Sequence, residues 1–401
     1  MQTRDHPVFQ SIQTAVLLFH GRINSARQLY ISWRTVMMGS ICHRRRRLAL
    51  VVVTLGIAVC ALKVQAETPT IPTDLEQYQI GHGYSLPAYH LTLGGYASLQ
   101  AQDFEDHPLK ASIQDLSLFL NWTPGVRWQI FSEVNLTDTL GYEGGDFTTR
   151  NAEFNLERLY VDYAATDTVA LRIGKFLTPV GRWNQLHAAP LEWTVSRPLI
   201  TEELYAHKLT GLMIHGTKLI SGNEFDYSLF GDDSLNLDPD QVDTEDTGPN
   251  ILPSRNFNNA FGITLRYHLW NDLFQVGVSY LNSLVDGLSG RKHLFDSDLL
   301  WIYHDVELSG EMSYRISTNG LQKDEWGGFL QGVVPLYGHI FGVARGEIFD
   351  SAEVDHIARI VSLGIAYRPQ PALIYKLEYR LGNSTERLAP EGWLASIAIL
   401  F

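Results

Sequence analysis

From Tyr89 onward, apolar and polar residues alternate with a period of two, and this pattern limits the possible folds more than any other feature. In the segment 373–381, Leu or Tyr occupies every odd-numbered position, and Ile, Lys, Glu and Arg occupy the even-numbered ones. Segments 261–269 and 361–368 repeat the pattern. A strand places alternate side chains on opposite faces, whereas a helix would scatter them around its axis. The chain is therefore predicted to be all-β.

The alternating segments are long enough to cross a lipid bilayer. Most run for about 9–12 residues, which suits a tilted membrane-spanning strand, whereas soluble strands average about 5–6 residues. In a membrane barrel the apolar face meets lipid, and in a soluble β-sandwich, the alternative fold, it forms the core. The predicted strands lie near residues 89–100, 113–122, 127–137, 153–164, 169–177, 209–219, 223–231, 259–269, 273–281, 298–304, 306–316, 325–337, 339–349, 358–368, 372–382 and 392–401.

The connections between these segments alternate between short and long. Tight links lie at 123–125, 220–222, 270–272, 338 and 369–371, and longer ones near 101–112, 138–152, 178–208, 232–258, 282–297, 317–324, 350–357 and 383–391. Short periplasmic turns and long external loops are typical of bacterial outer-membrane barrels. An open sheet edge would leave backbone groups without partners in hydrocarbon. We therefore predict a closed transmembrane antiparallel up-and-down β-barrel of about 16 strands.

The two ends of the chain carry signals of export and assembly. Four arginines (44–47), the apolar run 48–62 and a small-residue site at 64–66 are typical of a secretory signal peptide. We expect a leader at 1–66 with its true start at Met37 or Met38, a short periplasmic segment at 67–88 and the barrel at 89–401. The last strand presents one apolar face that resembles the signal read by the outer-membrane barrel assembly machinery, formed by Trp393, Ala395, Ile397, Ile399 and Phe401. An ordinary amphipathic strand is the alternative.

Charge and cysteine content narrow the partners. Residues 67–401 hold 22 basic and 43 acidic residues, a net charge of −21, which disfavours nucleic acid. We expect contact with outer-membrane lipid and lipopolysaccharide. Both cysteines, Cys42 and Cys60, lie in the leader, so no disulfide is predicted; lipidation at Cys60 is an alternative. The acidic link 232–258 is interpreted as a solvated loop, with a Ca²⁺ site as the alternative. No motif indicates a cofactor or a metal.

A barrel of this width is too wide for side chains to fill, so we predict an aqueous lumen. The predicted lumen-facing charges are of both signs, so they do not indicate an ion selectivity. These residues either contribute to selectivity or are merely tolerated because the lumen contains water. Glu157 and Arg158 are adjacent and both face inward only if the strand has a bulge, and strand 339–349 is ambiguous. The predicted lumen-facing charges are Arg127, Glu133, Glu157, Arg172, Arg266, Glu311, Arg315, Arg368, Lys376, Glu378 and Arg380.

One stretch carries a family resemblance. Residues 171–181 read LRIGKFLTPVG and resemble the GKF–P–G stretch of the phosphate-selective porin O/P family, and the preceding strand 159–163 also fits. The resemblance implies a sixteen-stranded passive pore that forms a homotrimer. Phosphate selectivity does not follow, because the 178–208 link has only three Lys or Arg residues.

In sixteen-stranded porins the external loop after the fifth strand folds inward and narrows the pore. Here that loop is 178–208, and a ring of charge in it would act by size and field. A loop that merely covers the rim is the alternative. The predicted constriction residues are Arg182, Glu192, Arg197, Glu202, Glu203 and Lys208.

These features favour an outer-membrane porin that lets small hydrophilic solutes or ions diffuse passively. A second hypothesis is a non-conducting barrel that acts as a surface adhesin or structural protein. A third is a barrel lipase or protease, for which His187, His207 and Asp232 supply fragments of a site, but no nucleophile is marked. We predict that the chain is not an enzyme.

Overall fold

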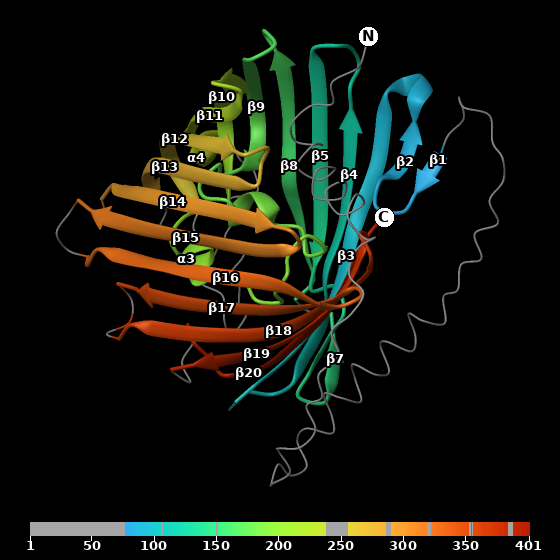
Figure 1. Ribbon diagram of the computed structural model, residues 1–401, viewed down its shortest axis with the longest axis vertical. Coiled ribbons are helices and arrows are strands. Elements are labelled where there is room, and N and C mark those ends of the chain that lie inside the picture. Colours follow the sequence, from blue (N-terminus) through green and yellow to red (C-terminus); the bar gives the residue numbers. More distant parts are fainter. Residues whose placement is uncertain are drawn as a thin grey trace.

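The computed structural model describes residues 77–401 except 106, 150, 238–255, 286–289, 319–321, 353, 355 and 384–387. The described chain is an all-β closed antiparallel barrel of sixteen strands (Figure 1), which confirms the predicted fold class. The barrel strands are β3 (Leu91–Phe104), β4 (Lys110–Trp122), β5 (Trp128–Thr137), β8 (Glu153–Ala164), β9 (Ala170–Leu177), β10 (Lys208–Ile220), β11 (Asn223–Asp232), β12 (Phe257–Leu269), β13 (Phe274–Val285), β14 (Lys292–Tyr303), β15 (Val306–Ser317), β16 (Glu325–Tyr337), β17 (Ile340–Asp350), β18 (Ala358–Gln370), β19 (Leu373–Gly382) and β20 (Gly392–Leu400).

Short elements accompany the barrel. In the described part of the chain, two hairpins, one before β3 and one between β5 and β8, add four short strands, and four short helical turns lie at the ends of strands or in loops. Among the described residues, no helix is long and apolar enough to cross a membrane. The short elements are β1 (Gln77–Gln79), β2 (Gly83–Leu86), η1 (Pro87–Tyr89), β6 (Gly141–Glu143), β7 (Asp146–Thr148), η2 (Trp183–Leu186), α3 (Leu199–Glu203) and α4 (Ser234–Leu237).

The first and last barrel strands close the cylinder. Strand β20 pairs antiparallel with β3, with Trp393 opposite Asp103 and Ile397 opposite Leu99. The backbone of Phe401 exchanges two 2.8 Å hydrogen bonds with Gly95. Closure leaves neither of these strands with a free edge, as a barrel in hydrocarbon requires. The role of this last strand in assembly, including Trp393, Ile397, Ile399 and Phe401, stays a prediction.

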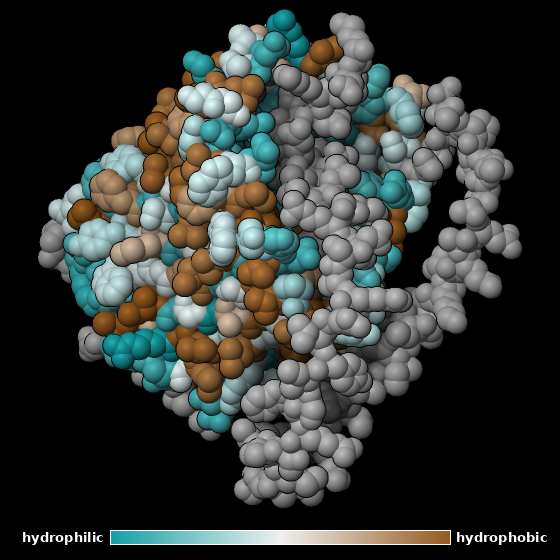
Figure 2. Space-filling model, in the orientation of Figure 1, coloured by the Kyte–Doolittle hydropathy of each residue, from teal (hydrophilic) through white to brown (hydrophobic). Residues whose placement is uncertain are grey.

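Apolar side chains cover the outside of the barrel. Leu212, Ile173 and Leu363 lie on strand faces and are 51–61% exposed, and Figure 2 shows apolar side chains spread over the visible outer surface. Large aromatics gather beside the short turns: Trp122, Trp128, Trp270, Tyr337 and Tyr367 are 40–84% exposed. Amphipathic rings favour the membrane–water interface. Exposed apolar area of this kind fits a lipid-facing surface and not the core of a sandwich.

Several strands extend further than the sequence indicated. Strand β14 begins at Lys292, six residues before its expected start, and β3 continues to Phe104. The prediction was wrong at the start of β14 because 292–297, including Asp296, was assigned to a loop, and Asp298 was taken as the first strand residue. Both are buried on the lumen face, where the Ser313 hydroxyl donates to Asp296 and Arg266 pairs with Asp298 at 3.0 Å. Polar groups in an aqueous lumen do not interrupt a strand.

Several expectations fall wholly or partly outside the described residues. These are the leader 1–66 with Cys42 and Cys60, residues 67–76 of the N-terminal segment, and most of the acidic link, 238–255. The described part of the N-terminal segment forms the β1–β2 hairpin, and β2 pairs with the start of β3. The chain is thus already tied to the barrel sheet before Leu91.

Candidate functional site

The link between β9 and β10, residues 178–207, folds into the barrel, and we call it the inner loop. Its two ends are tied together at a neck. The Thr178 amide donates to the His207 carbonyl at 2.8 Å, and its hydroxyl donates to the Ala206 carbonyl at 2.6 Å. Asn184 donates its side-chain amide to the carbonyls of both Thr178 and His207. Gly181 then turns the chain with a φ of 63°, which glycine adopts without steric cost.

Beyond the neck, strand β15 holds the beginning of the inner loop. The Glu311 carboxylate accepts hydrogen bonds from the backbone amides of Arg182, at 3.0 Å, and Trp183, at 3.3 Å. Arg266 of β12 donates to the Gly181 carbonyl at 3.1 Å. Burial, with neighbouring Arg266, lowers the pKa of the Arg182 guanidinium to about 10, and this group donates to Gln275 at 2.6 Å. Arg182 is therefore directed at the barrel wall.

Strand β19 holds the middle of the loop. The Glu378 carboxylate accepts hydrogen bonds from the amides of Val195 and Ser196, at 2.7 and 3.0 Å, and from the Ser196 hydroxyl at 2.5 Å. Lys376 donates to the carbonyls of Ala189 and Thr194 at 3.1 and 2.8 Å. A carboxylate and an ammonium two residues apart on one strand thus satisfy opposite backbone groups of the same segment.

Strand β17 supplies a third anchor. Arg345 is 1% exposed and donates to the Thr194 hydroxyl and to the Ser196 carbonyl and hydroxyl, all within 2.9 Å. Glu347 pairs with Arg345 at 2.8 Å and accepts the Leu199 amide at 2.8 Å. Hydrogen bonds to charged groups are worth about 1.5–3 kcal/mol each, so these anchors fix the loop firmly. We call the lumen face of β15–β19 the latched wall.

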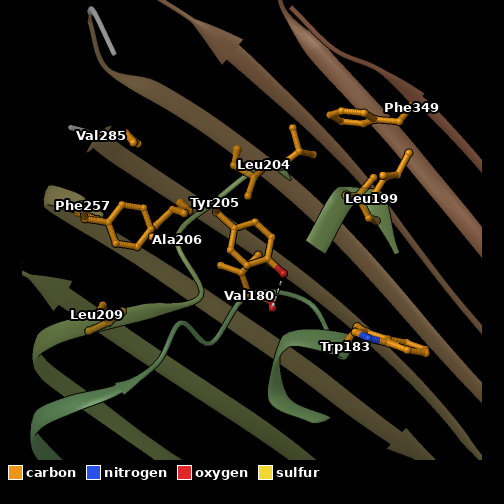
Figure 3. Close-up of a cluster of buried hydrophobic side chains, with 14 of the residues drawn as sticks. Val180, Trp183, Leu199, Leu204, Tyr205, Ala206, Leu209, Phe257, Val285 and Phe349 are labelled. Atoms are coloured by element: carbon orange, nitrogen blue, oxygen red, sulfur yellow. Dashed lines mark hydrogen bonds between the residues drawn. The ribbon is translucent and has the colours of Figure 1, made fainter. Parts of the chain in front are cut away.

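Apolar side chains of the inner loop pack against the same interior. Figure 3 shows Leu199, Leu204 and Val180 of the loop near Phe257, Phe349 and other barrel side chains. The Tyr205 hydroxyl donates to the Val180 carbonyl at 3.3 Å. Burial of such side chains contributes about 1.5–3 kcal/mol each. The part of the barrel that the loop occupies is a packed core rather than a water layer.

The lumen face of β4, β5 and β8, which we call the open wall, presents a different chemistry. Glu133 accepts hydrogen bonds from Ser117 at 2.7 Å and Arg158 at 2.5 Å. Glu157 is the extra residue of a bulge, because Glu133 pairs with Arg158 and the next position, Val134, pairs with Leu156. The sequence required a bulge here for the adjacent Glu157 and Arg158 both to face the lumen. Among the described residues, the recorded partners of Glu133 and Glu157 are side chains and not the backbone of the inner loop.

Part of the inner loop keeps contact with water on the side toward this wall. The side chains of Arg197, Glu202, His207 and Lys208 are 22–29% exposed, whereas Arg345 on the latched wall is fully buried. Arg197 lies 3.3 Å from Glu192 and 3.2 Å from Glu202, and Lys208, the first residue of β10, lies 3.1 Å from Glu157.

The protonation of these loop groups follows from their surroundings. Although burial opposes it, Glu202 and Glu192 raise the pKa of the Arg197 guanidinium above its ordinary value. Burial lowers the pKa of His207 and raises that of Glu192. His207 is thus neutral near pH 7, and Arg197 carries its charge throughout the physiological range.

The structure separates the predicted constriction residues into two groups. Arg197, Glu202 and Lys208 keep partial exposure, whereas Arg182 is directed at the wall, and Glu192 and Glu203 are 6% and 9% exposed. The expectation for Arg127 was wrong, because this residue lies in the exposed turn before β5 and not on a strand face.

The other predicted lumen charges have these contacts within the barrel. Glu133 and Glu157 are described above. Arg172 pairs with Asp162, Arg266 with Asp298 and Arg315 with Glu325. Carbonyls of the inner loop accept hydrogen bonds from Arg315, Arg368 and Lys376, and its amides donate to Glu311 and Glu378. Arg380 donates to the Leu388 carbonyl in the link between β19 and β20.

Sequence reasoning missed Arg345 and Glu347. Their strand was ambiguous because its lumen face also carries the apolar Phe341, Val343 and Phe349, which pack in the interior next to the loop. Asp115 was missed as well. Leu116 and Leu118 are exposed on the outer face, so Asp115 and Ser117, which alternate with them, lie on the lumen face. Alternation around this position was the available signal.

The histidines do not assemble an enzyme site in the described residues. His187 lies 3.4 Å from Glu133, His207 contacts the Thr201 carbonyl at 3.0 Å, and Asp232 accepts the Thr210 amide at 2.8 Å. One group with metal-ligand chemistry lies at a short turn, where oxygen or nitrogen atoms of Glu224, His268 and Asp272 come within 4.8 Å of one another. Both ring nitrogens of His268 already contact carboxylates, those of Asp226 and Asp272.

Comparisons with known proteins agree with this architecture. No family model matches the chain. An uncharacterized protein of Aquifex aeolicus (strain VF5) is 24% identical over 381 residues, covering 82% of this chain and 83% of that protein.

Solved structures with a similar fold are outer-membrane barrels. OmpF of Salmonella typhi has a TM-score of 0.56 with 12% identity, covering 82% of this chain and 100% of that one. An anion-selective porin from Comamonas acidovorans has a TM-score of 0.53 with 13% identity, covering 77% and 98%. The outer membrane channel DcaP of Acinetobacter baumannii has a TM-score of 0.52 with 10% identity, covering 78% and 97%. These likenesses show that the fold is that of a general porin-like barrel.

Proposed function

We propose that this protein is an outer-membrane porin through which small hydrophilic solutes or ions diffuse passively, with the inner loop as the constriction. One observation carries the proposal: a closed sixteen-stranded barrel with an apolar outer surface holds a long loop anchored across its interior. A loop whose only role was to cover the rim would need no buried carboxylates on β15 and β19. Solute size and the field of the lumen charges would then set permeability.

Reconstitution tests the proposal directly. The protein, refolded in detergent and inserted into planar bilayers, should give discrete conductance steps, and proteoliposomes should swell in small sugars but not in large ones. A non-conducting barrel would favour the adhesin or structural role instead. Folding is checked independently by heat-modifiable migration on gels, so that failure to insert is not confused with failure to conduct.

The constriction itself needs a separate test. Replacing Glu311 and Glu378 together by Gln should loosen the inner loop and raise both the conductance and the size of the largest sugar admitted. Neutralising Arg197 should shift the cation-to-anion preference, whereas Arg182, which is directed at Gln275, should have less effect. An unchanged size limit after removal of both carboxylates would contradict a constriction built from this loop.

The assembly and the partners belong to the same proposal. We infer a homotrimer in the outer membrane, in contact with lipopolysaccharide and inserted by the barrel assembly machinery. An outer membrane protein of Vibrio cholerae with the same type of fold, OmpT, has been described in a trimer form, with a TM-score of 0.51 to this chain. Conductance that closes in three equal steps would support the trimer. The resemblance to the phosphate-selective family remains a prediction about the stretch 171–181 alone.

A further inference from the structure

The two lumen walls use their charges differently, and this difference bears on the class of solute. On the latched wall the loop backbone occupies the ionised groups: Glu311, Glu347 and Glu378 accept loop amides, and Lys376 and Arg345 donate to loop oxygens. A charge whose hydrogen-bonding atoms are engaged and buried offers little to a passing ion. The field along the open path therefore depends on the groups of the open wall and of the partly exposed side of the inner loop.

Most charges on that path are matched by a nearby opposite charge. Glu133 pairs with Arg158 at 2.5 Å, and Glu157 pairs with Lys208 at 3.1 Å. Arg197 lies between Glu192 and Glu202, so one guanidinium faces two carboxylates. Matched pairs have little net field at a distance, and of the two carboxylates beside Arg197 only Glu202 is partly exposed, whereas Glu192 is buried and also interacts with Lys376.

Asp115 on β4 differs from these charges because it has no ion pair among the described residues. It is partly exposed on the lumen face and accepts hydrogen bonds only from neutral groups that the structure records, the Ser98 hydroxyl at 2.6 Å and the Asn135 amide at 3.2 Å. Within the described residues, no basic side chain forms a salt bridge with it. Electrostatic interactions link it with Glu157, with Glu192 and His187 of the inner loop, and with Lys376 of β19, so its carboxylate lies among the charges around the inner loop.

We infer that the pore prefers cations, and that Asp115 is a selectivity-determining residue, because its carboxylate is partly exposed on the lumen face and no basic side chain of the described residues forms a salt bridge with it. The inference rests on the proposed function and narrows its solute class to small cations and cationic solutes. A unit charge about 6 Å from a permeating ion in water changes the local ion concentration about threefold. Removing one unpaired carboxylate is therefore enough to alter the ratio of cation to anion permeability measurably.

Reversal potentials in bilayers under a tenfold KCl gradient test this. The wild-type protein should favour K⁺ over Cl⁻, and Asp115→Asn should lower the permeability ratio by about threefold or more. Asp115→Glu keeps the charge and should preserve the preference. Asp146→Asn, in the exposed β6–β7 hairpin, removes a carboxylate outside the lumen and serves as the matched control.

A second variant, expected to change the ion preference in the opposite direction, keeps the inference testable if Asp115→Asn fails to fold. Lys208→Gln leaves Glu157 without its partner and should raise the preference for K⁺ by a similar factor. A conducting wild-type pore that prefers Cl⁻, or a ratio that neither Asp115→Asn nor Lys208→Gln changes, would overturn the inference while leaving the porin function intact. A correctly folded barrel that never conducts would overturn both.

Discussion

The latched wall and the open wall belong to one barrel, yet they place ionisable side chains in opposite circumstances. On β15–β19 the charged groups are buried and serve to hold backbone, as Arg345 and Glu378 do. On β4, β5 and β8 the charged groups pair with one another or, for Asp115, with neutral groups, and several keep contact with water. The same residue types therefore hold loop backbone on one side and, in our proposal, set the electrostatic field on the other.

The largest effect is expected from Arg345→Ala on the latched wall. The change leaves the buried Glu347 without its partner and removes three donors from the inner loop, so the free energy of unfolding should fall by about 3–5 kcal/mol. Urea unfolding of the refolded protein in detergent, followed by tryptophan fluorescence, measures this. Arg359→Ala, an exposed arginine on the neighbouring strand β18, is the control. Equal stability of the two variants would remove the distinction between the walls.

Glu378→Gln should have the next largest effect. Glutamine keeps an acceptor oxygen but loses the charge that strengthens the bonds to Val195 and Ser196, so we expect a loss of about 1–3 kcal/mol. Because the middle of the inner loop is then held less firmly, single-channel conductance should be larger and noisier. Glu105→Gln, at an exposed position beyond β3, should change neither quantity. A Glu378→Gln pore with wild-type conductance would show that this anchor does not position the loop.

On the open wall, the pair of Glu157 and Lys208 should contribute little to stability. Partly exposed pairs of this kind are worth about 0–1 kcal/mol, so a double-mutant cycle with Glu157→Gln and Lys208→Gln should give a coupling energy below about 1 kcal/mol. The single variants should nevertheless change the ion preference in opposite directions. A coupling as large as that of the buried pairs on β17 would mean that both walls are structural.

The smallest effect concerns pH. Burial lowers the pKa of His207, so this side chain is neutral at pH 7 and gains a positive charge only when the pH falls below its ordinary range. The added charge opposes cation entry, and the K⁺ preference should decrease on acidification from pH 7 to pH 5, with a contribution of about twofold from one charge at 10 Å in water. The decrease should be smaller in His207→Gln, and an identical pH profile would exclude His207 from the path.

Much of the barrel could be predicted because alternation is a local property. In each membrane strand, odd- and even-numbered residues face opposite sides, so the alternation of apolar and polar residues identifies the strand. The short turns lie where this alternation stops. The start of β14 was misplaced because the segment before Asp298, which includes Asp296, was interpreted as a loop, although the Asp296 carboxylate is buried on the lumen face of the strand. Polarity marks a loop in a soluble domain, but inside a wide barrel it also marks the wetted side of a strand.

The inner loop could be located but its anchoring could not be derived. Glu311 and Glu378 were placed on the lumen face, yet their partners are backbone amides 129 and 183 residues away in the chain. Such contacts depend on how the loop crosses the lumen, and no local pattern records that path. Arg345 was not predicted to face the lumen for a related reason. Its strand packs against the inner loop, so its lumen face also carries apolar residues and the two faces of the strand differ little in polarity.

The anchors on the latched wall bind main-chain groups, and main-chain groups are the same whichever amino acid occupies a position. The carboxylates accept hydrogen bonds from the backbone N–H groups of Arg182, Trp183, Val195 and Leu199. Every residue except proline has such an N–H group. Apart from Thr194 and Ser196, whose hydroxyls also bind Arg345 or Glu378, these anchors do not depend on the side chains that the loop carries. Pores for different solutes could be obtained by substituting residues on the exposed side of the loop, while the path of the loop through the barrel stays the same.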